Sequence, residues 1–149
     1  MTAFVVEPTT IDVAGVVELL ERAVGGDDRA RLDRACARYC AGPAGLTGVF
    51  AERSVIGVVG YFHHTDCRGT LRCVELLHIA TDPRWERQGV GAALVEWVQA
   101  EHPGDPIETE TDGDAVGFYR AIGFDVASLG QRYPGVERFR VVLRPNLIR

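Results

Sequence analysis

The sequence contains no lysine, and all 16 of the basic residues among its 149 are arginine. Without lysine, the chain has no Schiff-base lysine, no phosphate-binding P-loop lysine and no Ser-Lys dyad. Serine is almost as scarce, since only Ser54 and Ser128 are present and neither lies in a Gly-x-Ser-x-Gly motif. A hydrolase built on a nucleophile elbow is therefore excluded as well.

Long apolar runs and a basic surplus are also missing. No run approaches the ~20 residues of a membrane-spanning helix, and the opening MTAFVVEPTT lacks the regions of a secretory signal. The net charge is −5, whereas nucleic-acid-binding modules are typically basic. We therefore expect a cytoplasmic protein with neither a membrane nor a nucleic acid as partner. Its length predicts a single domain over residues 1–149.

Cysteine gives no sign of a metal site. The four cysteines, none in a Cys-x-x-Cys pair, are Cys36, Cys40, Cys67 and Cys73. A zinc site would have to combine Cys67 and Cys73 with the two histidines at 63–64. Structural zinc sites usually have closely paired ligands, and this set lacks that spacing. We favour ordinary packing roles for the cysteines and expect no metal.

Apolar periodicity and turn residues predict alternating strands and helices. Strands are predicted over Ala3–Val6, Gly48–Arg53, Ile56–His63, Leu71–Ala80, Ile107–Thr111, Phe124–Leu129 and Glu137–Leu143. Helices are predicted at about Val13–Ala23, from Asp27 or Asp28 to Cys40, at Gln88–Glu101, and from an Asp112 cap to Ile122 before Gly123. We expect a hairpin turn at Ser54 and another at 133–135. This order is typical of an α/β (α+β) protein whose mixed sheet carries helices on its faces.

The most informative stretch is Ile79–Leu94, in which a strand ends, a turn follows and two glycines open a helix. Gly89 and Gly91 have no Cβ, so a ligand can approach the backbone closely. The first N–H groups of a helix lack internal partners and carry partial positive charge, which suits phosphate. Arg84 and Arg87 lie beside this start. The alternative is an ordinary glycine-punctuated helix start with solvent-exposed arginines.

Two other phosphate-binding motifs do not fit this loop. The P-loop needs lysine, and the dinucleotide fingerprint needs a third glycine where the chain has Leu94.

The six residues Glu86–Gly91 instead resemble the Gln/Arg-x-x-Gly-x-Gly/Ala loop of the GNAT superfamily of N-acetyltransferases. Ala115, Phe118-Tyr119 and Gly123-Phe124 resemble its second signature. The resemblance implies a mostly antiparallel sheet of about seven strands flanked by four helices over nearly the whole chain.

The resemblance also implies acetyl-CoA as the acetyl donor. Backbone groups at the end of the strand, in Ile79, Ala80 and Thr81, are then expected to hold the pantetheine arm and the thioester carbonyl. The N–H groups expected to hold the pyrophosphate are those of Gln88, Gly89, Val90, Gly91 and Ala92. Arg84 and Arg87 are expected to add positive charge.

Two positions depart from the family pattern. Glu86 stands where the family has Gln or Arg, and its carboxylate repels a pyrophosphate unless it points away or caps the helix. Asp112 stands where the family often has Asn. Aspartate can cap the following helix, but it has no amide hydrogen to donate to the cofactor.

Two residues are the catalytic candidates. Tyr119 matches the family's thiolate-facing tyrosine, and we expect it to stabilise the leaving thiolate first and to donate a proton second. Phe118 is the better candidate for a core aromatic. Glu75 resembles the catalytic glutamate of the histone-acetylating branch, but four strand residues separate it from Ile79, about 13 Å, so it would act through water. A solvent-facing glutamate and His78, on the opposite face, are the alternatives.

The acceptor is predicted to be a primary amine of a small molecule, acetylated by direct attack in a ternary complex. Glu108, Glu110 and Asp112 share one face of a predicted strand. We favour a solvated face over a wall that attracts a cationic acceptor. The alternative functions are a CoA-binding regulatory module without turnover and an acetyltransferase of protein N-termini or lysines. A homodimer is left open.

Overall fold

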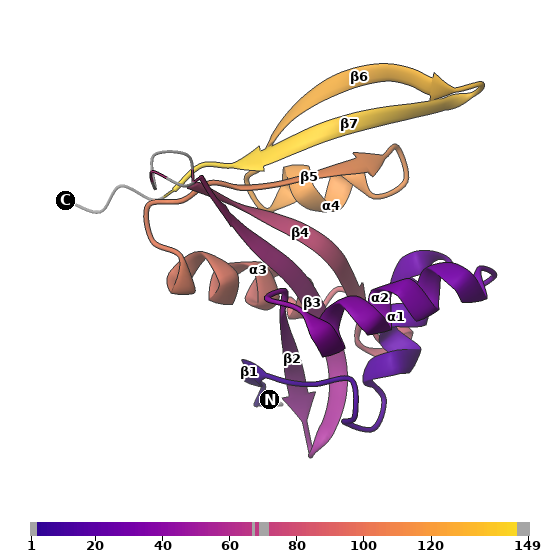
Figure 1. Ribbon diagram of the computed structural model, residues 1–149, viewed down its shortest axis with the longest axis vertical. Coiled ribbons are helices and arrows are strands. Elements are labelled where there is room, and N and C mark those ends of the chain that lie inside the picture. The colour runs from indigo at the N-terminus through magenta and orange to yellow at the C-terminus, as the bar shows by residue number, and fades with distance from the viewer. Residues whose placement is uncertain (1–2, 67, 69–71, 146–149) are drawn as a thin grey trace. The chain divides into compact units, whose positions relative to one another are not determined.

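The computed structural model describes residues 3–66, 68 and 72–145 (Figure 1). In this part of the chain the strands are β1 (Val5–Pro8), β2 (Gly45–Ala51), β3 (Ser54–Thr65), β4 (Arg72–Thr81), β5 (Ile107–Asp112), β6 (Asp125–Tyr133) and β7 (Val136–Leu143). The helices are α1 (Val16–Val24), α2 (Arg29–Ala41), α3 (Val90–Glu101) and α4 (Val116–Ala121), with a 3-10 turn η1 (Pro83–Trp85). None of these helices is long and apolar enough to cross a membrane.

The strands form one mixed sheet in the order β1-β2-β3-β4-β5-β7-β6. The β4–β5 pair is parallel, and the β1–β2, β2–β3, β5–β7 and β6–β7 pairs are antiparallel. The predicted fold class is therefore confirmed. A parallel pair needs a crossover, and α3 supplies it between β4 and β5.

The chain folds as two compact units. The first unit comprises Met1–Phe62 and Leu76–Ala100, and the second comprises His63–Glu75 and Glu101–Arg149. Strands β3 and β4 each contribute residues to both units. The single domain predicted from the length stays a prediction.

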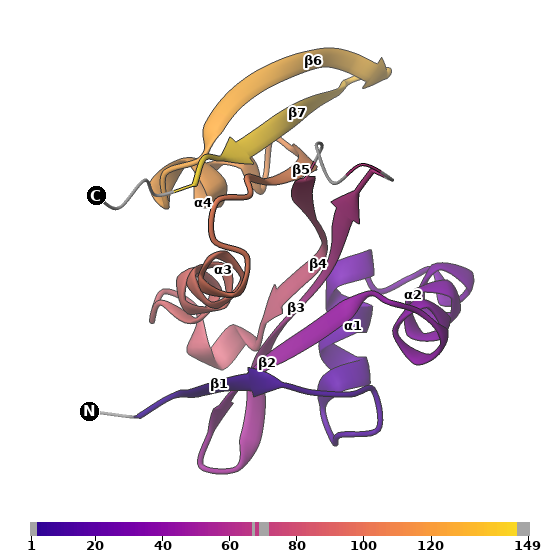
Figure 2. The same ribbon diagram turned by 60° about the vertical axis from the view of Figure 1, so that its left-hand side comes forward.

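In the first unit, α1 and α2 cover one face of the sheet and α3 covers the other (Figures 1 and 2). Val58 of β3 packs in the same core as Val16 and Leu20 of α1, and all three are fully buried. Its neighbour Gly57 faces α3, where an added Cβ would lie 2.5 Å from a methyl group of Val90. The strand therefore separates two packed layers, one on each face.

The β2–β3 hairpin turns one step earlier than predicted. Ser54 is the first residue of β3 and pairs with Ala51, so the turn consists of Glu52 and Arg53. Both have positive φ, 50° and 70°, as a two-residue turn matching the twist of its strands requires. Glycine or asparagine usually marks such a turn, and their absence explains why the sequence misplaced it.

Helix α1 also begins later than predicted. It starts at Val16, after Gly15 with a φ of 93°, because this left-handed residue ends the preceding turns before the helix can propagate. A Cβ at Gly15 would lie 2.7 Å from a methyl group of Val55. For α2, the predicted cap is confirmed, since the Asp28 carboxylate accepts the Arg31 N–H at 3.0 Å.

In the second unit, the predicted stop of α4 is confirmed at Gly123, whose φ is 101°. The predicted cap differs, because α4 begins only at Val116. Asp112 is the last residue of β5, and its carboxylate accepts the N–H groups of Asp114 and Ala115 at 3.0 and 3.1 Å. The side chain therefore holds the turn that leads into the helix rather than the helix itself. The final hairpin turns between Tyr133 and Val136.

Candidate active site

The loop before α3 presents a row of unused backbone donors. Arg87 and Gly89 have positive φ values of 63° and 83°. These two left-handed residues turn the chain into the helix. The first helical hydrogen bond is donated by Ala93 to Gly89 O, at 2.9 Å. The N–H groups of Val90 and of the two residues after it precede that bond, and they find no acceptor within the described part of the chain.

The position of Gly89, next to these donors, is open. A Cβ added at Gly89 would meet no heavy atom within 4 Å, so nothing in the described chain fills this position. Open space beside unpaired N–H groups at a helix start is an arrangement that binds phosphate oxygens. The predicted loop residues, Gln88 to Ala92, thus lie together in a geometry that fits a pyrophosphate.

The two arginines beside the loop differ in their partners. Arg84 forms two hydrogen bonds with Asp82, Nη2 to Oδ2 at 2.8 Å and Nε to Oδ1 at 3.2 Å. The side-chain and backbone hydrogen bonds from Arg84 lower the pKa of Asp82. Arg87 is exposed and has no ion pair among the described residues. Arg87 is therefore the arginine of this loop whose charge is left for a ligand.

The carboxylate of Glu86 has a cationic partner. Its Oε1 lies 2.7 Å from Nη2 of Arg22 on α1, and both side chains are about half exposed. The ion pair offsets the charge that the sequence places beside the expected pyrophosphate. Nothing in the sequence indicates this partner, because 64 residues separate the two.

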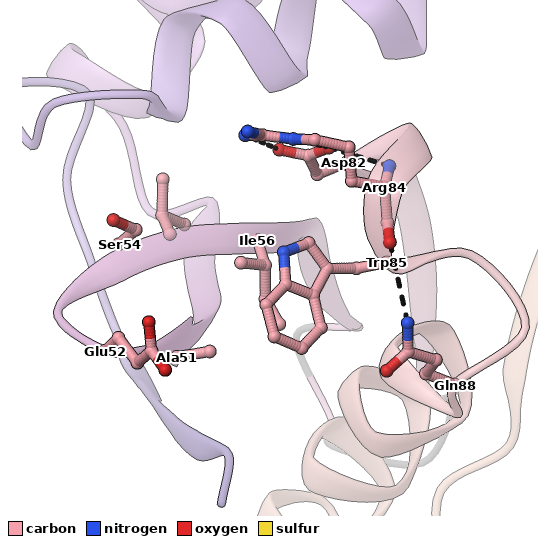
Figure 3. Close-up of a pocket in the computed structure, with 9 residues that line it drawn as sticks. Ala51, Glu52, Ser54, Ile56, Asp82, Arg84, Trp85 and Gln88 are labelled. Atoms are coloured by element: carbon pink, nitrogen blue, oxygen red, sulfur yellow. Dashed lines mark hydrogen bonds and ion pairs between the residues drawn. The ribbon is translucent and has the colours of Figure 1, made fainter. Parts of the chain in front are cut away.

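A cavity of about 470 Å³ lies next to the loop in the first unit (Figure 3). It is lined by Ala51, Glu52, Ser54, Val55, Ile56, Asp82, Arg84, Trp85 and Gln88. The Trp85 indole stands between β3 and the start of α3, and its ring meets that of Phe4 edge-on, with centroids 5.9 Å apart. Trp85 cannot be identified as a cavity residue from the sequence, since a single aromatic in a loop carries no pattern.

Glu75, the candidate base, is paired in the second unit. Its Oε1 lies 2.8 Å from Nε2 of His64, and both side chains are nearly half exposed. The neighbouring His63 pairs with Asp105 at 2.7 Å. Each histidine that a zinc site would have needed thus has a carboxylate partner, while Cys67 lies outside the described residues. Within them, no group of three or more His, Cys, Asp or Glu side chains is arranged to hold a metal ion.

The alternative base, His78, is half-buried in the first unit and hydrogen-bonds Tyr39 of α2. Burial lowers its pKa, and the charges of Arg38 and Arg31 lower it further. Both effects favour the neutral imidazole. No local pattern indicates the tyrosine partner, which lies 39 residues away in the chain.

Tyr119 is buried, with only 6% of its surface exposed, whereas Phe118 is 36% exposed. The expectation that Phe118 is the core aromatic is therefore wrong. The Tyr119 ring packs edge-on against Phe118 and Phe124, with centroids 5.1 and 5.2 Å apart. Burial, with a smaller contribution from Asp112, raises the pKa of Tyr119 to about 12. Its hydroxyl makes no hydrogen bond within the described chain.

The acidic residues of β5 are bound to arginines of β7. Glu108 lies 2.8 Å from Arg140, and Glu110 lies 3.1 Å from Arg138. Both pairs are solvent-exposed, in agreement with the favoured solvated face, and a bare acidic wall is wrong because each carboxylate has a diagonal cross-strand partner.

Comparison with known proteins gives one family. Residues 45–126, just over half of the chain, match the family model described as an acetyltransferase (GNAT) domain. No curated protein matches the chain.

Solved structures show the same fold. An aminoglycoside 6′-N-acetyltransferase complexed with coenzyme A has a TM-score of 0.76 and 11% identity, over 94% of this chain and 96% of that one. Arabidopsis thaliana NAA60, in complex with a bisubstrate analogue, has a TM-score of 0.75 and 15% identity, over 97% and 99%. A GNAT-family acetyltransferase from Bacillus cereus ATCC 10987 has a TM-score of 0.72 and 18% identity, over 97% and 99%.

The family model covers the strands and the loop from which the candidate site is built. It includes β2 to β5, the loop before α3, and α4 with the buried Tyr119. The fold agrees with that of the solved structures over nearly the whole chain. On these grounds the chain belongs to the GNAT family of acetyltransferases.

Proposed function

We propose that this protein transfers the acetyl group of acetyl-CoA to a primary amine of a small molecule, by direct attack in a ternary complex. The observation that carries the proposal is the start of α3, where unused N–H groups follow the open position at Gly89. In a protein of this family, that arrangement supports pyrophosphate binding and hence a CoA thioester as donor.

Different residues of the chain then bind different parts of acetyl-CoA. The N–H groups of Gln88–Ala92 hold the pyrophosphate, and Arg87 adds a full charge. The backbone of Ile79–Thr81 at the end of β4 holds the pantetheine arm. Asp112 acts indirectly, because its carboxylate already fixes the turn before α4. When bound, acetyl-CoA supplies the activated thioester.

The acceptor must lose a proton before it attacks. An alkyl amine with a pKa near 10.4 is mostly protonated at pH 7, and forming the neutral amine costs about 4.6 kcal/mol. Glu75 takes this proton through water, and its bond to His64 holds the carboxylate in place. The amine nitrogen then attacks the thioester carbon, a C–N bond forms, the C–S bond breaks and the sulfur leaves as thiolate.

Tyr119 stabilises that thiolate by donating a hydrogen bond. Full proton transfer from a hydroxyl of pKa about 12 to a thiolate whose acid has a pKa near 8.5 is uphill by about 5 kcal/mol. The second proton of the amine therefore ends on the thiolate or in solvent, and Tyr119 keeps its own.

The proposal is tested with a panel of amines and acetyl-CoA, in which the released thiol is measured. The panel contains small primary amines and amino acids, together with peptides that offer a free N-terminus or a lysine. Turnover of small amines supports the proposal, and turnover of peptides alone replaces it with a protein acetyltransferase. Binding of acetyl-CoA without released thiol for any amine supports a CoA-binding module instead.

A further inference from the structure

A half-buried polar site lies in the first unit, where α2 packs on the sheet. Tyr39 of α2 passes over Gly60 of β3, and its hydroxyl lies 2.6 Å from Nδ1 of His78 on β4. Arg38, the neighbour of Tyr39 in the helix, has its guanidinium 5.8 Å from the ring centre of Phe62. Gly60 and Phe62 are two residues apart on one strand, so they share a face of the sheet. Helix α2 therefore brings a phenol and a guanidinium to the same face.

The hydrogen bond from Tyr39 determines which nitrogen of His78 carries the proton. Burial raises the pKa of Tyr39, so the phenol keeps its proton, and burial lowers the pKa of His78, which favours the neutral ring. A phenol donates better than it accepts, and an unprotonated imidazole nitrogen is a good acceptor. The hydroxyl therefore donates to Nδ1, and the proton of the ring is on Nε2. This Nε2–H has no acceptor within the described part of the chain.

The charges that act on His78 are positive. After burial, the guanidinium groups of Arg38 and Arg31 lower its pKa further, and the two arginines are about two turns apart on α2. Neither has an ion pair among the residues that the structure describes, whereas Arg29 of the same helix pairs with Asp33 at 3.3 Å. The whole chain has a net charge of −5. Two uncompensated cations beside an N–H donor are therefore a local exception that favours an anion.

His78 directly precedes the segment of β4, Ile79–Thr81, that is proposed to hold the pantetheine arm. Side chains alternate along a strand, so His78 and Ala80 share a face, and Ala80 packs in the same core as Val16 of α1. The imidazole is one to three residues away from the proposed thioester segment, about 3 to 10 Å along the strand. An anion held by His78 and Arg38 can therefore place an amine a few bonds away at the thioester.

We propose that Arg38, Arg31 and the Nε2–H of His78 bind an anionic group of the acceptor, and that the enzyme thereby selects a small primary amine that carries a carboxylate or a phosphate. Tyr39 is a positioning residue, because it acts only through the ring of His78. This inference rests on the proposed function and names the class of its acceptor. The transfer is unchanged, since the C–N bond forms and the C–S bond breaks at the amine. A polyamine is disfavoured, because its second cation meets two like charges.

The test pairs anionic amines with neutral analogues, namely β-alanine with β-alaninamide and phosphoethanolamine with ethanolamine. Thiol release is measured for the wild type, Arg38→Gln, Arg38→Lys and Tyr39→Phe. Each variant is compared with the wild type on the same amine, which cancels the different pKa values of the amines. Arg34→Gln is the matched control, because Arg34 is an exposed arginine of the same helix that is not among the charges acting on His78.

Arg38→Gln should raise KM for the anionic amines at least about tenfold, a loss near 1.4 kcal/mol, with kcat and the KM values for neutral amines and acetyl-CoA unchanged. Arg38→Lys and Tyr39→Phe should raise the same KM by less, and Arg34→Gln should not change it. An equal effect of Arg38→Gln on anionic and neutral amines, or an equal effect of Arg34→Gln and Arg38→Gln, overturns the inference. A rise in KM for acetyl-CoA alone also overturns it, since the arginine would then bind the donor.

The proposed function can fail independently of this inference. If no amine is turned over, the transferase proposal falls, and the anion site is tested by binding. β-Alanine and inorganic phosphate are titrated into the CoA-loaded protein, and the imidazole signal of His78 is followed by NMR, assigned by its absence in His78→Gln. A saturable shift in the wild type, with an affinity about tenfold weaker in Arg38→Gln, supports the site. No saturable shift, or equal affinity in both proteins, overturns it.

Discussion

The hydroxyl of Tyr39 lies 2.6 Å from Nδ1 of His78, so a side chain of α2 fixes an imidazole on β4. The two rings also meet edge-on, with centroids 5.6 Å apart. Tyr39 passes directly over Gly60 of β3, where any Cβ would collide with it. The pair therefore depends on a glycine in the neighbouring strand, and it holds His78 in a site where burial disfavours the imidazolium.

The first prediction concerns stability against pH. The pKa of native His78 is lowered by burial and then by Arg38 and Arg31, while in the unfolded chain it is near 6.5. As the pH falls through about 6.5, the unfolded chain binds more protons than the native protein, and the free energy of unfolding decreases. His78→Gln should remove this part of the pH dependence, by at most about 1.4 kcal/mol per pH unit.

Urea unfolding between pH 5 and pH 8 measures this difference. Tyr39→Phe is the companion variant, because it keeps the ring and removes the hydrogen bond, and it should lose about 1 kcal/mol. Identical pH slopes for the wild type and His78→Gln would show that the native pKa is not lowered.

The second prediction tests the loop before α3. Acetyl-CoA should raise the Tm of the wild type, and Gly89→Glu should abolish the rise because a carboxylate enters the open space beside the donors. The matched control is Gly104→Glu. Gly104 has a φ of 87° against 83° for Gly89, and a Cβ there also meets nothing within 4 Å. Both variants carry the same backbone strain, so a Tm rise that survives in Gly89→Glu contradicts the loop assignment.

The fold was largely predictable from the sequence because its signals are local. Apolar periodicity, the Asp28 cap and the stop at Gly123 each act within one element, and the structure has all of them. The β2–β3 turn was misplaced because Glu52 and Arg53 adopt positive φ without glycine. A two-residue turn that contains neither glycine nor asparagine has no recognisable sequence signature.

The partners of the candidate site residues were not predictable. Glu86 pairs with Arg22, and Glu75 with His64, across different elements. Periodicity tells which face of a strand a residue occupies, but it does not tell which side chain lies opposite. Tyr119 shows the same limit, because its burial depends on packing against Phe124 after the helix has ended.

The third prediction concerns the leaving group. If the Tyr119 hydroxyl faces the thiolate, Tyr119→Phe should lower kcat about tenfold or more and leave KM for acetyl-CoA near the wild-type value. Since the pKa of Tyr119 is raised to about 12, the loss should be the same from pH 6 to pH 9. A Tm loss with unchanged kcat would instead assign Tyr119 to the core alone.

The last prediction separates the two candidate bases. A carboxylate that acts through water removes the proton of the acceptor before attack. Glu75→Gln should therefore lower kcat/KM most at pH values below the pKa of the amine, at which the amine is protonated. The loss at pH 7 should be roughly 100-fold, the lower range for general base catalysis. Raising the pH should recover part of it, because solvent then supplies the neutral amine.

His78 provides the contrast, because its Nδ1 is already bonded to Tyr39 and its lowered pKa makes it a weak base. His78→Gln should therefore leave the shape of the pH–rate profile unchanged. Wild-type rates in Glu75→Gln across pH 6–9, together with loss of the acidic limb in His78→Gln, would make His78 the base. If neither variant changes the profile, the enzyme selects the rare neutral amine from solution, and no residue of the protein removes the proton.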